Sequence, residues 1–315
     1  MPARQAVGRY PKVKVSCSKA ALVNGVQAVY KAVSPKATIP VLSGILMETC
    51  AQGLRLVAYD LDLGIETFIP VTIEREGAMV MPARYLSDIT RRLPHSEVVI
   101  EYREEVRAAD ILSDRSNFTV KTMPAGEYPA LPEIPSVSTW SIPEPGLKTM
   151  IKRTAPAVAT EDNRAFYTGI YTIFERDMLT MVSTDTFRLA HRTMSVSLPL
   201  ENQVGVIIPG KTLFEVERNL SPEGDREVSM ALTDRHAMFR VGSTTYITRL
   251  LEGQFPNYKQ VFPQNIPARL ICDRLQLLNS IDRVSLMCKD ELSAIRMSAF
   301  ALSIIIDVTS KLNSA

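Results

Sequence analysis

The chain of 315 residues has few cysteines, four in all. They are Cys17, Cys50, Cys272 and Cys288. Their spacing is not that of metal ligands, and each lies in an apolar stretch, which is typical of reduced core thiols. This scarcity predicts a cytoplasmic protein without a disulfide framework.

Histidine is equally scarce, with His95, His191 and His236 as the full set. None of them is paired with a cysteine or a carboxylate at a ligand-like spacing. The sequence also has no G-x-S-x-G nucleophile elbow and no H-E-x-x-H metal motif. We therefore expect no metal ion, no cofactor and no catalytic activity.

Long apolar runs and a strong net charge are missing too. No run approaches the ~18 residues that cross a bilayer, and residues 1–14 are polar and basic, unlike a signal peptide. We expect no membrane partner. The net charge is only +2, so no strong overall field draws the chain to a nucleic acid. Any contact with DNA must come from charge that is arranged locally.

One stretch, residues 205–212, matches the phosphate-binding pattern G-x-x-x-x-G-K-[ST]. That motif needs a loop whose N–H groups surround phosphates, but its middle residues here are Val-Ile-Ile-Pro. β-Branched residues resist positive φ, and proline has no N–H to donate. We predict a strand over 204–208 instead, so a nucleotide hydrolase is the disfavoured alternative.

A passage centred on Thr184 and Asp185 is present twice. Residues 178–183 form a weakly alternating strand, and the turn at Asp185 allows an Asp side chain to bond its own backbone. Residues 56–63 have the same form, with Asp60 placed 125 residues earlier (185 − 60). Taken alone, either passage is an ordinary β-turn.

Two further landmarks recur in the same order. Residues 81–86 recur as 208–213, and residues 127–129 recur as 254–256, both at an offset of 127 (209 − 82 and 256 − 129). A nearly constant spacing predicts two copies of one domain. A third copy begins, since residues 281–283 resemble residues 151–153, but it is incomplete.

Each full copy is predicted to be an α+β unit, with two helices packed on antiparallel sheet. The helices are expected from Ser18 to about residue 33, from Pro82, and over 146–154 and 212–220. The strands are expected over 13–17, 40–48, 54–59, 66–73, 97–102, 109–113 and 118–123, and then over 168–174, 179–183, 227–233, 237–241 and 246–251.

These elements set the domain boundaries. Residues 1–12 are expected to be a disordered extension. The first domain covers 13–130, the second covers 139–255, and 266–315 form a partial third domain. The intervening segments 124–138 and 254–267 carry the proline content of linkers.

The predicted helices carry basic residues at corresponding positions in the copies. On a shared side they could hold phosphates without reading a base sequence. The alternative for each single residue is an ordinary solvated helix face. The set is Lys19, Lys31, Arg84, Arg91, Arg92, Lys148, Lys152, Arg153, Lys211, Arg218, Arg274 and Arg283.

Four segments match the pattern of a known family: residues 34–46, 81–84, 183–190 and 252–258. Together they resemble the bacterial DNA polymerase III beta subunit family, the sliding clamps. The resemblance covers about residues 13–307. It implies tandem DNA-clamp domains that close head-to-tail into a two-chain ring around duplex DNA, with helices lining the hole. It also implies a non-enzymatic processivity factor whose pocket binds short peptides of the polymerase and the clamp loader.

Site residues follow from this resemblance, position by position. The DNA-facing residues would be Lys36, Arg84, Arg164 and Lys211. The peptide pocket would be formed by Tyr167, Thr184, Thr186, Phe187, Arg188, Leu189, Pro256 and Val261. An apolar groove with an arginine and two threonines to fix polar groups suits an extended peptide.

The sequence departs from the family pattern in two places. A small residue and a histidine usually precede the Arg-Leu pair, but this chain has Thr186 and Phe187 there. The third domain is incomplete, which leaves an alternative: a monomeric peptide-binding module that does not close a ring.

Overall fold

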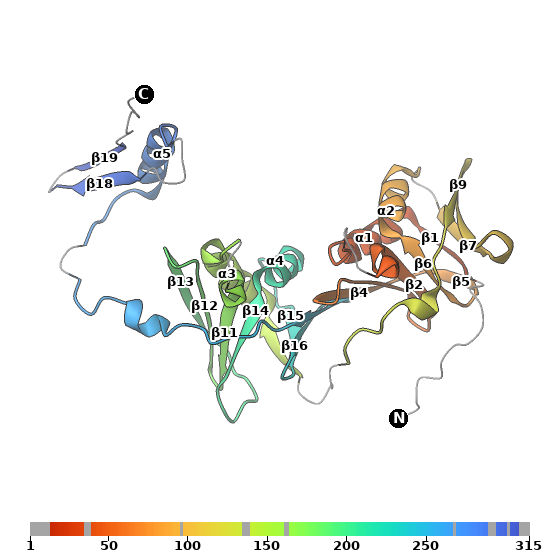
Figure 1. Ribbon diagram of the computed structural model, residues 1–315, viewed down its shortest axis with the longest axis horizontal. Helices are drawn as coiled ribbons and strands as arrows, with labels where there is room; N and C mark the ends of the chain where they lie inside the picture. Colours follow the sequence, from red (N-terminus) through yellow and green to blue (C-terminus); the bar gives the residue numbers. More distant parts are fainter. Residues whose placement is uncertain are drawn as a thin grey trace. The chain divides into compact units, whose positions relative to one another are not determined.

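A computed structural model describes residues 13–34, 39–94, 97–133, 139–160, 164–266, 269–288, 294–300 and 303–308. The chain forms two compact units, Met1–Phe255 and Pro256–Ala315, which Figure 1 colours in sequence order. The first unit contains both predicted full copies. The predicted extension over residues 1–12 lies outside the described residues.

The first copy consists of two helices and antiparallel strands. Its helices are α1 (Lys19–Tyr30) and α2 (Ala83–Arg92). Ser18 caps α1 as predicted, because its hydroxyl accepts a 3.2 Å hydrogen bond from the Ala21 amide. The strands are β1 (Lys14–Ser18), β2 (Gly44–Cys50), β3 (Gly53–Tyr59), β4 (Leu63–Ile69), β5 (Thr72–Arg75), β6 (Ala78–Pro82), β7 (Glu97–Arg103), β8 (Ala108–Ser113) and β9 (Ser116–Lys121).

The second copy repeats this order with helices α3 (Glu144–Thr154) and α4 (Gly210–Asn219). Its strands are β10 (Thr139–Pro143), β11 (Gly169–Glu175), β12 (Met178–Thr184), β13 (Leu189–Ser195), β14 (Val204–Pro209), β15 (Glu227–Leu232), β16 (His236–Val241) and β17 (Thr244–Arg249). Early elements lie 125 residues apart, as β2 and β11 do (169 − 44). Late elements lie 127 apart, as α2 and α4 do (210 − 83). The repeat predicted from the sequence is confirmed.

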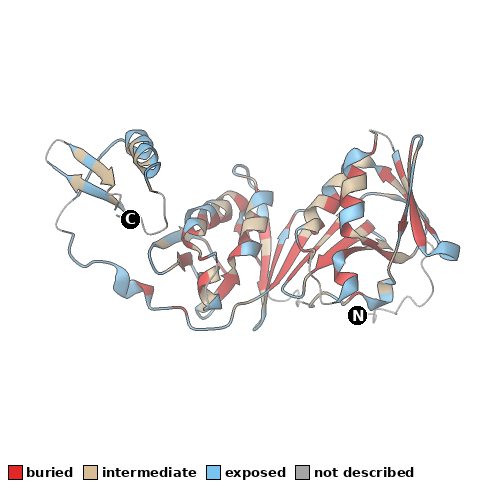
Figure 2. Ribbon diagram, turned by 45° about the horizontal axis from the view of Figure 1, so that its top comes forward, coloured by how far each residue is buried: buried red, intermediate tan, exposed pale blue. Residues whose placement is uncertain are grey.

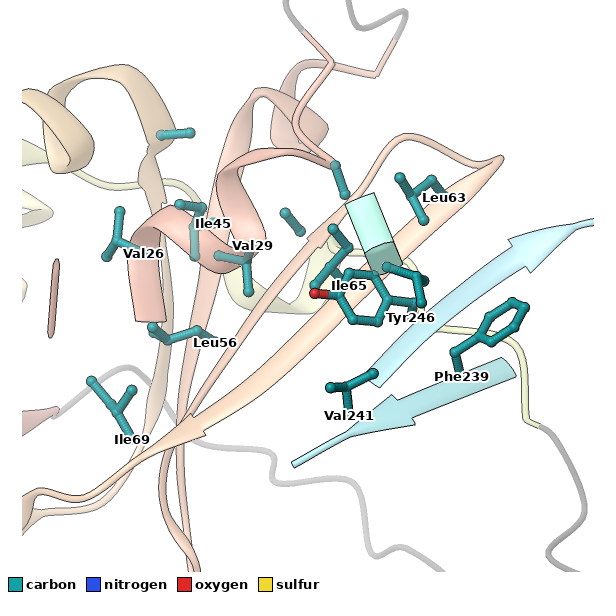
Figure 3. Packing of buried hydrophobic residues seen from close by; sticks show 14 of the residues in the cluster. Val26, Val29, Ile45, Leu56, Leu63, Ile65, Ile69, Phe239, Val241 and Tyr246 are labelled. Atoms are coloured by element: carbon teal, nitrogen blue, oxygen red, sulfur yellow. The ribbon is translucent and has the colours of Figure 1, made fainter. Parts of the chain in front are cut away.

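One sheet runs through both copies. Its strand order is β10-β15-β16-β17-β4-β3-β2-β6, and β17 of the second copy pairs antiparallel with β4 of the first. In that ladder Tyr246 stands opposite Ile65, and Figure 3 shows both side chains within the packed core. Both are fully buried. The shared sheet and core join the two copies into one unit.

The remaining strands form two smaller sheets in the first unit. The first copy has the order β5-β1-β7-β8-β9, and the second has β13-β12-β11-β14. Each copy places its first helix with one apolar face inward. α1 buries Leu22 and Val26, and α3 buries Leu147 and Ile151 at the corresponding positions. Figure 2 shows in red that buried residues of this unit lie on its strands and on parts of its helices.

The second unit contains a short 3₁₀ turn (Tyr258–Val261), helix α5 (Arg274–Ser285), and the strand pair β18 (Ile295–Ala299) and β19 (Ile304–Val308). Asp273 caps α5 by accepting a 2.8 Å hydrogen bond from the Gln276 amide. In contrast to α1 and α3, helix α5 has no buried residue. None of the helices in the described residues is long and apolar enough to span a membrane.

Four local expectations are corrected by the structure. The strand expected over 40–48 begins only at Gly44, since Pro40–Ser43 form a 3₁₀ helix. The first helix ends at Tyr30 rather than near residue 33. The strand expected over 66–73 is two strands, β4 and β5, with Pro70 between them, because proline cannot donate to a ladder. Cys17 is buried as a core thiol, but Cys272 is exposed.

Candidate functional site

The duplicated turn has the same hydrogen bonds in both copies. In the first copy, Asp60 Oδ1 accepts from the amides of Asp62 at 3.1 Å and Leu63 at 2.7 Å. In the second, Asp185 Oδ1 accepts from the amides of Phe187 at 3.0 Å and Arg188 at 2.9 Å. The predicted Asp-capped turn is therefore confirmed in both copies.

The same turn holds a residue in the left-handed backbone region in each copy. Leu61 has φ of 78° and Thr186 has φ of 77°. A non-glycine residue rarely adopts this conformation, least of all a β-branched one. Strain of this kind persists only where surrounding bonds enforce it, and it is often found at functional sites.

The turn of the second copy, residues 184–189, is tightly held. Thr184 Oγ1 accepts from the Thr186 amide at 3.1 Å and donates to the Arg188 carbonyl at 2.8 Å. Arg188 Nε also donates to Asp185 Oδ2 at 2.9 Å. Burial alone would raise the pKa of Asp185, but the hydrogen bonds from Arg188 and Phe187 and the arginine charge outweigh it, so the pKa is lowered.

Phe187 projects from this fixed turn and is 96% exposed. Leu189, at the start of β13, is only partly buried. Arg188 keeps 66% of its side chain exposed although it is paired with Asp185. The turn therefore presents an aromatic ring and a guanidinium group to solvent.

Aromatic side chains pack beside the start of β11. Tyr167 is buried, and its ring centroid lies 6.5 Å from that of Phe255. Phe255 in turn stacks on Tyr171 at 5.0 Å. The Arg164 guanidinium lies 4.4 Å from the Tyr167 ring centroid, a cation–π distance. Arg164, expected to face DNA, thus contacts a residue expected to face a peptide.

Pro256 and Val261 belong to the second unit, whereas the turn over residues 184–189 belongs to the first. Both are exposed, Val261 by 67%. Between them Tyr258 is buried, and its ring meets Phe262 edge-to-face with centroids 6.4 Å apart.

The predicted DNA-facing residues have different surroundings. Lys36 lies outside the described residues. Arg84 and Lys211 occupy the same position in α2 and α4, one residue after the helix begins, and both are exposed. Lys211 Nζ lies 3.1 Å from Asp60 Oδ2, which ties α4 to the turn of the first copy.

Two of the basic residues have a structural role instead. Lys148 donates to the carbonyls of Glu217 and Leu220, each at 2.9 Å, at the end of α4. Lys19 donates in the same way to the Leu93 carbonyl at the end of α2. A cation at a helix C-terminus satisfies its last carbonyls and complements its dipole. The expectation that all these helix cations belong to one phosphate-binding surface is wrong for these two.

The apparent phosphate-binding pattern is not a loop. Residues 204–209 form β14, which pairs with β11 over Gly169–Phe174. Gly205 faces Tyr171 so closely that an added Cβ would lie 2.5 Å from its hydroxyl oxygen. The strand predicted there is confirmed, and it pairs with β11 at the edge of the sheet.

A pocket of about 400 Å³ opens where the two copies meet. The Arg249 amide donates to the Asp62 carbonyl at 2.9 Å beside it, and Thr212 and Thr248 share a buried 2.9 Å hydrogen bond. Its lining residues are Asp60, Asp62, Leu63, Ala165, Pro209, Lys211, Thr212, Thr248, Arg249, Leu250, Leu251 and Glu252.

Metal-binding clusters are not found among the residues that the structure describes. The sequence did not predict the junction pocket, the Asp60–Lys211 pair or the Arg164–Tyr167 contact. The only signal for them was the repeat itself, which places Asp60 and Asp185 at equivalent positions.

Family models match most of the chain. The model for the DNA polymerase III beta subunit, N-terminal domain, matches residues 13–132. The model for the central domain of the same subunit matches residues 141–257.

Individual relatives agree with these models. The beta sliding clamp of Bacillus subtilis is 34% identical over 286 residues, which are 88% of this chain and 75% of that protein. The beta sliding clamp of Staphylococcus aureus is 31% identical over 268 residues, 82% of this chain and 70% of that protein.

Solved structures show the same likeness. The DNA polymerase sliding clamp from Bacillus subtilis superposes with a TM-score of 0.85 at 31% identity, over 94% of this chain and 83% of that one. The Pseudomonas aeruginosa DnaN sliding clamp bound to griselimycin also gives a TM-score of 0.85, at 27% identity, over 95% of this chain and 85% of that one.

Proposed function

Because this chain belongs to the DNA polymerase III beta subunit family, the beta sliding clamps, we propose that it acts as a non-catalytic processivity factor. In this role a ring encircles duplex DNA and tethers a replicative polymerase to it. A closed ring is held on DNA by topology, so weak contacts to the duplex are sufficient and allow sliding.

The observation that carries this proposal is the pairing of β17 with β4. This pairing joins the β4 edge of the first copy to the β17 edge of the second copy. Two different edges of the module therefore meet, as in a head-to-tail interface. By the repeat, β9 of the first copy corresponds to β17, and β13 of the second copy corresponds to β4. In the described part of the chain, β9 pairs with β8 alone and β13 with β12 alone. A head-to-tail interface repeated around an axis generates a ring, and a second copy of this chain is the partner we propose.

The DNA contacts in this proposal are to phosphate. Arg84 and Lys211 lie at the same position of equivalent helices, and Arg164 is exposed near the start of β11. Lys36 completes the proposed set. Such cations attract the duplex electrostatically without reading its sequence, which suits a clamp that must slide.

The peptide contacts are assigned to the fixed turn and the aromatic residues beside it. Tyr167, Thr184, Thr186, Phe187, Arg188 and Leu189 belong to the first unit, and Pro256 and Val261 to the second. We propose that short segments of the polymerase and the clamp loader bind the residues of the first unit. An apolar surface with a few fixed polar groups is typical of peptide recognition.

The test is loading onto nicked circular DNA by a clamp loader, followed by gel filtration to measure retained protein. We expect retention on the circle and loss when the circle is cut, because the link is topological. The Arg84→Glu and Lys211→Gln double variant should load less at physiological salt. Asp60→Asn is the matched control, because it disrupts the Asp60–Lys211 pair but keeps the lysine charge.

Light scattering measures the assembly directly. A ring of two chains has twice the mass of the 35.0 kDa chain. A mass of one chain at micromolar concentration, together with no retention on circular DNA, would reject the ring and leave a monomeric peptide-binding module.

A further inference from the structure

We propose that the second unit is completed by the second unit of another copy of this chain. In this assembly residues 269–272 of each copy form a strand beside β18 of the other, and the two α5 helices pack side by side. The interface uses residues of the second unit alone. It is therefore independent of the peptide site and of the ring proposed above.

Each full copy is itself built from two halves with the same order of elements. In the second copy a strand, a helix and three strands (β10, α3, β11, β12, β13) are followed by the same order again (β14, α4, β15, β16, β17). The first copy has the same two halves, with β5 added between them. Such a segment is referred to as a half-module. The described residues of the second unit hold the helix and two following strands of one half-module, α5, β18 and β19.

The two half-modules of a full copy are held together by reciprocal strand pairing. The strand before the helix of each half pairs with the first strand after the helix of the other half. In the second copy these pairs are β10 with β15 and β14 with β11. In the first copy they are β1 with β7 and β6 with β2. A half-module by itself therefore has an unpaired segment before its helix and an open edge on the strand that follows it.

The second unit has both of these features. Residues 269–272 precede α5 and belong to no strand of the described structure. Two apolar side chains of this segment are exposed, Leu270 by 48% and Ile271 by 87%. In the described residues β18 pairs with β19 alone, so its other edge is open. An open edge next to exposed apolar residues favours pairing with another chain.

Helix α5 also lacks the neighbour that helices of the full copies have. Leu277 and Ile281 lie four and eight residues after the cap of α5, and Leu147 and Ile151 hold the same places in α3. Leu147 and Ile151 are fully buried, whereas Leu277 and Ile281 are only half-buried. The difference is expected, because α3 packs beside α4, to which Lys148 is bonded.

A second copy of this chain is the occupant that these features indicate. The four half-modules of the first unit already have their partners inside that unit. The surface of the second unit is self-complementary, because it offers both the segment before the helix and the edge that receives such a segment. Two copies related by a two-fold axis satisfy both at once, which is an isologous interface.

The full copies also predict the register of the exchanged strands. In all four half-modules the residue just before the helix cap is buried and stands opposite a buried residue of the other half. These pairs are Cys17–Val98, Met81–Ile45, Ile142–Val228 and Ile208–Ile170. The cap of α5 is Asp273, so the corresponding residue of the second unit is Cys272.

The partner of Cys272 is found by counting back from the turn after the receiving strand. Where that turn has two residues, the buried residue lies five places before the residue that closes the turn. This holds for Ile45, Ile170 and Val228. In β18 the closing residue is Phe300, whose amide donates to the Ser303 carbonyl at 2.8 Å. Ile295 lies five places before it, so we expect Cys272 opposite the partner's Ile295.

The chemistry of the strands agrees with this register. Side chains two residues apart share a face of a strand, so Leu270 stands opposite the partner's Met297 on the same face as Cys272. Leu270 and Met297 are 48% and 46% exposed in the single chain, and the pairing buries them. A shift of one residue would instead turn the charged Arg296 to this face.

Disulfide cross-linking tests the interface and its register. Opposite residues of antiparallel strands have Cα atoms about 4.5–5.5 Å apart, within the range that a disulfide spans. The full-length protein carries Ile295→Cys together with Cys50→Ser and Cys288→Ser. After oxidation by air and copper phenanthroline at low micromolar concentration, we expect a covalent dimer on a non-reducing gel. Adding Cys272→Ser should abolish it, because the link joins Cys272 to the new cysteine.

The controls use neighbouring residues. Arg296→Cys in place of Ile295→Cys should give no covalent dimer, because its side chain points to the opposite face of the strand from Cys272. Leu270→Lys should reduce the Ile295→Cys dimer, since it places a charge in the apolar contact without touching a side chain buried in the single chain. Ile266→Lys is the matched control, since Ile266 is 70% exposed and lies before the exchanged segment.

The outcomes also separate this interface from the ring. If Ile295→Cys gives only monomer or a link within one chain, the interface is rejected. Equal dimer from Arg296→Cys, or dimer that persists with Leu270→Lys, would also reject it, because the link would then reflect random collision. None of these results affects the ring, which is tested by retention on circular DNA. A covalent dimer without such retention would reject the ring and keep this interface.

Discussion

Lys211 in α4 places its Nζ 3.1 Å from Oδ2 of Asp60, in the turn between β3 and β4. Asp60 is the counterpart of Asp185, whose Oδ2 accepts instead from Arg188 in its own turn, at 2.9 Å. The same backbone geometry thus serves two purposes. In the first copy the turn contacts the next copy, and in the second it presents side chains to solvent.

Asp60 should matter more for stability than Lys211 does. Asp60→Ala removes the acceptor for two amides as well as the ion pair, so we expect a loss of about 1–2 kcal/mol in the free energy of unfolding. Lys211→Ala removes only an exposed ion pair, so its effect should be at most about 0.5 kcal/mol. Urea unfolding measures both.

Asp185→Ala is the matched control for this comparison, since it removes the same two amide bonds without touching the copy junction. Its cost should be similar to that of Asp60→Ala. If Lys211→Ala proved as costly as Asp60→Ala, the ion pair rather than the turn would hold the junction.

Glycine should relieve the strain of the turns. Thr186 has φ of 77° and Leu61 has φ of 78°, a region that glycine occupies freely. We expect Thr186→Gly and Leu61→Gly each to raise the free energy of unfolding by at most about 1 kcal/mol. Glycine gives the unfolded chain more entropy, which is destabilising, but the relieved backbone strain outweighs this cost. Thr186→Val, which stays β-branched, should destabilise. Thermal unfolding of the three variants decides the point, and destabilisation by both glycines would show that the turn is not strained.

The sequence predicts local features of this fold well and distant contacts poorly. The turns at Asp60 and Asp185 and the cap at Ser18 depend on neighbouring residues, so the pattern of residue types is sufficient. The pairing of Tyr246 with Ile65 joins strands far apart in the chain, and alternation of apolar residues does not say which edges meet.

The basic residues show the same limit within the candidate site. Lys148 and Lys152 lie one turn apart on α3, and composition treats them alike. Lys148 is bonded to the end of α4, whereas Lys152 is exposed. That difference depends on how the two helices pack, which determines the carbonyls within reach of each lysine.

Gly253 should be required beside the aromatic residues. Its φ is +127°, and a Cβ there would lie 2.9 Å from Cδ1 of Phe166. Gly253→Ala combines an unfavourable backbone with a close contact, so we expect a loss of about 1–3 kcal/mol and weaker peptide binding. Gly126→Ala is the control, because an added Cβ there meets nothing within 4 Å and its φ is not positive. Denaturant unfolding and peptide titration of both variants test this, and equal effects of the two substitutions would contradict it.

Cys17 should report unfolding through its thiol. Burial, with a smaller contribution from Glu97, raises the pKa of Cys17 from 9.0 to about 11, whereas Cys272 is exposed. The thiolate is the reactive species, so a disulfide reagent at pH 8 should label Cys272 rapidly and Cys17 only after unfolding. Rapid labelling of Cys17 in the folded protein would contradict its burial.

The raised pKa of Cys17 also predicts how the free energy of unfolding changes at alkaline pH. The folded state keeps a proton on Cys17 that the unfolded state releases, so this contribution is fully present below pH 9 and is lost as the pH rises toward 11. Cys17→Ala removes the raised pKa, so its free energy of unfolding should fall less steeply between pH 9 and 11 than that of the wild-type protein. Identical slopes for the two proteins would mean that the Cys17 thiol ionises as easily in the folded chain as in the unfolded one.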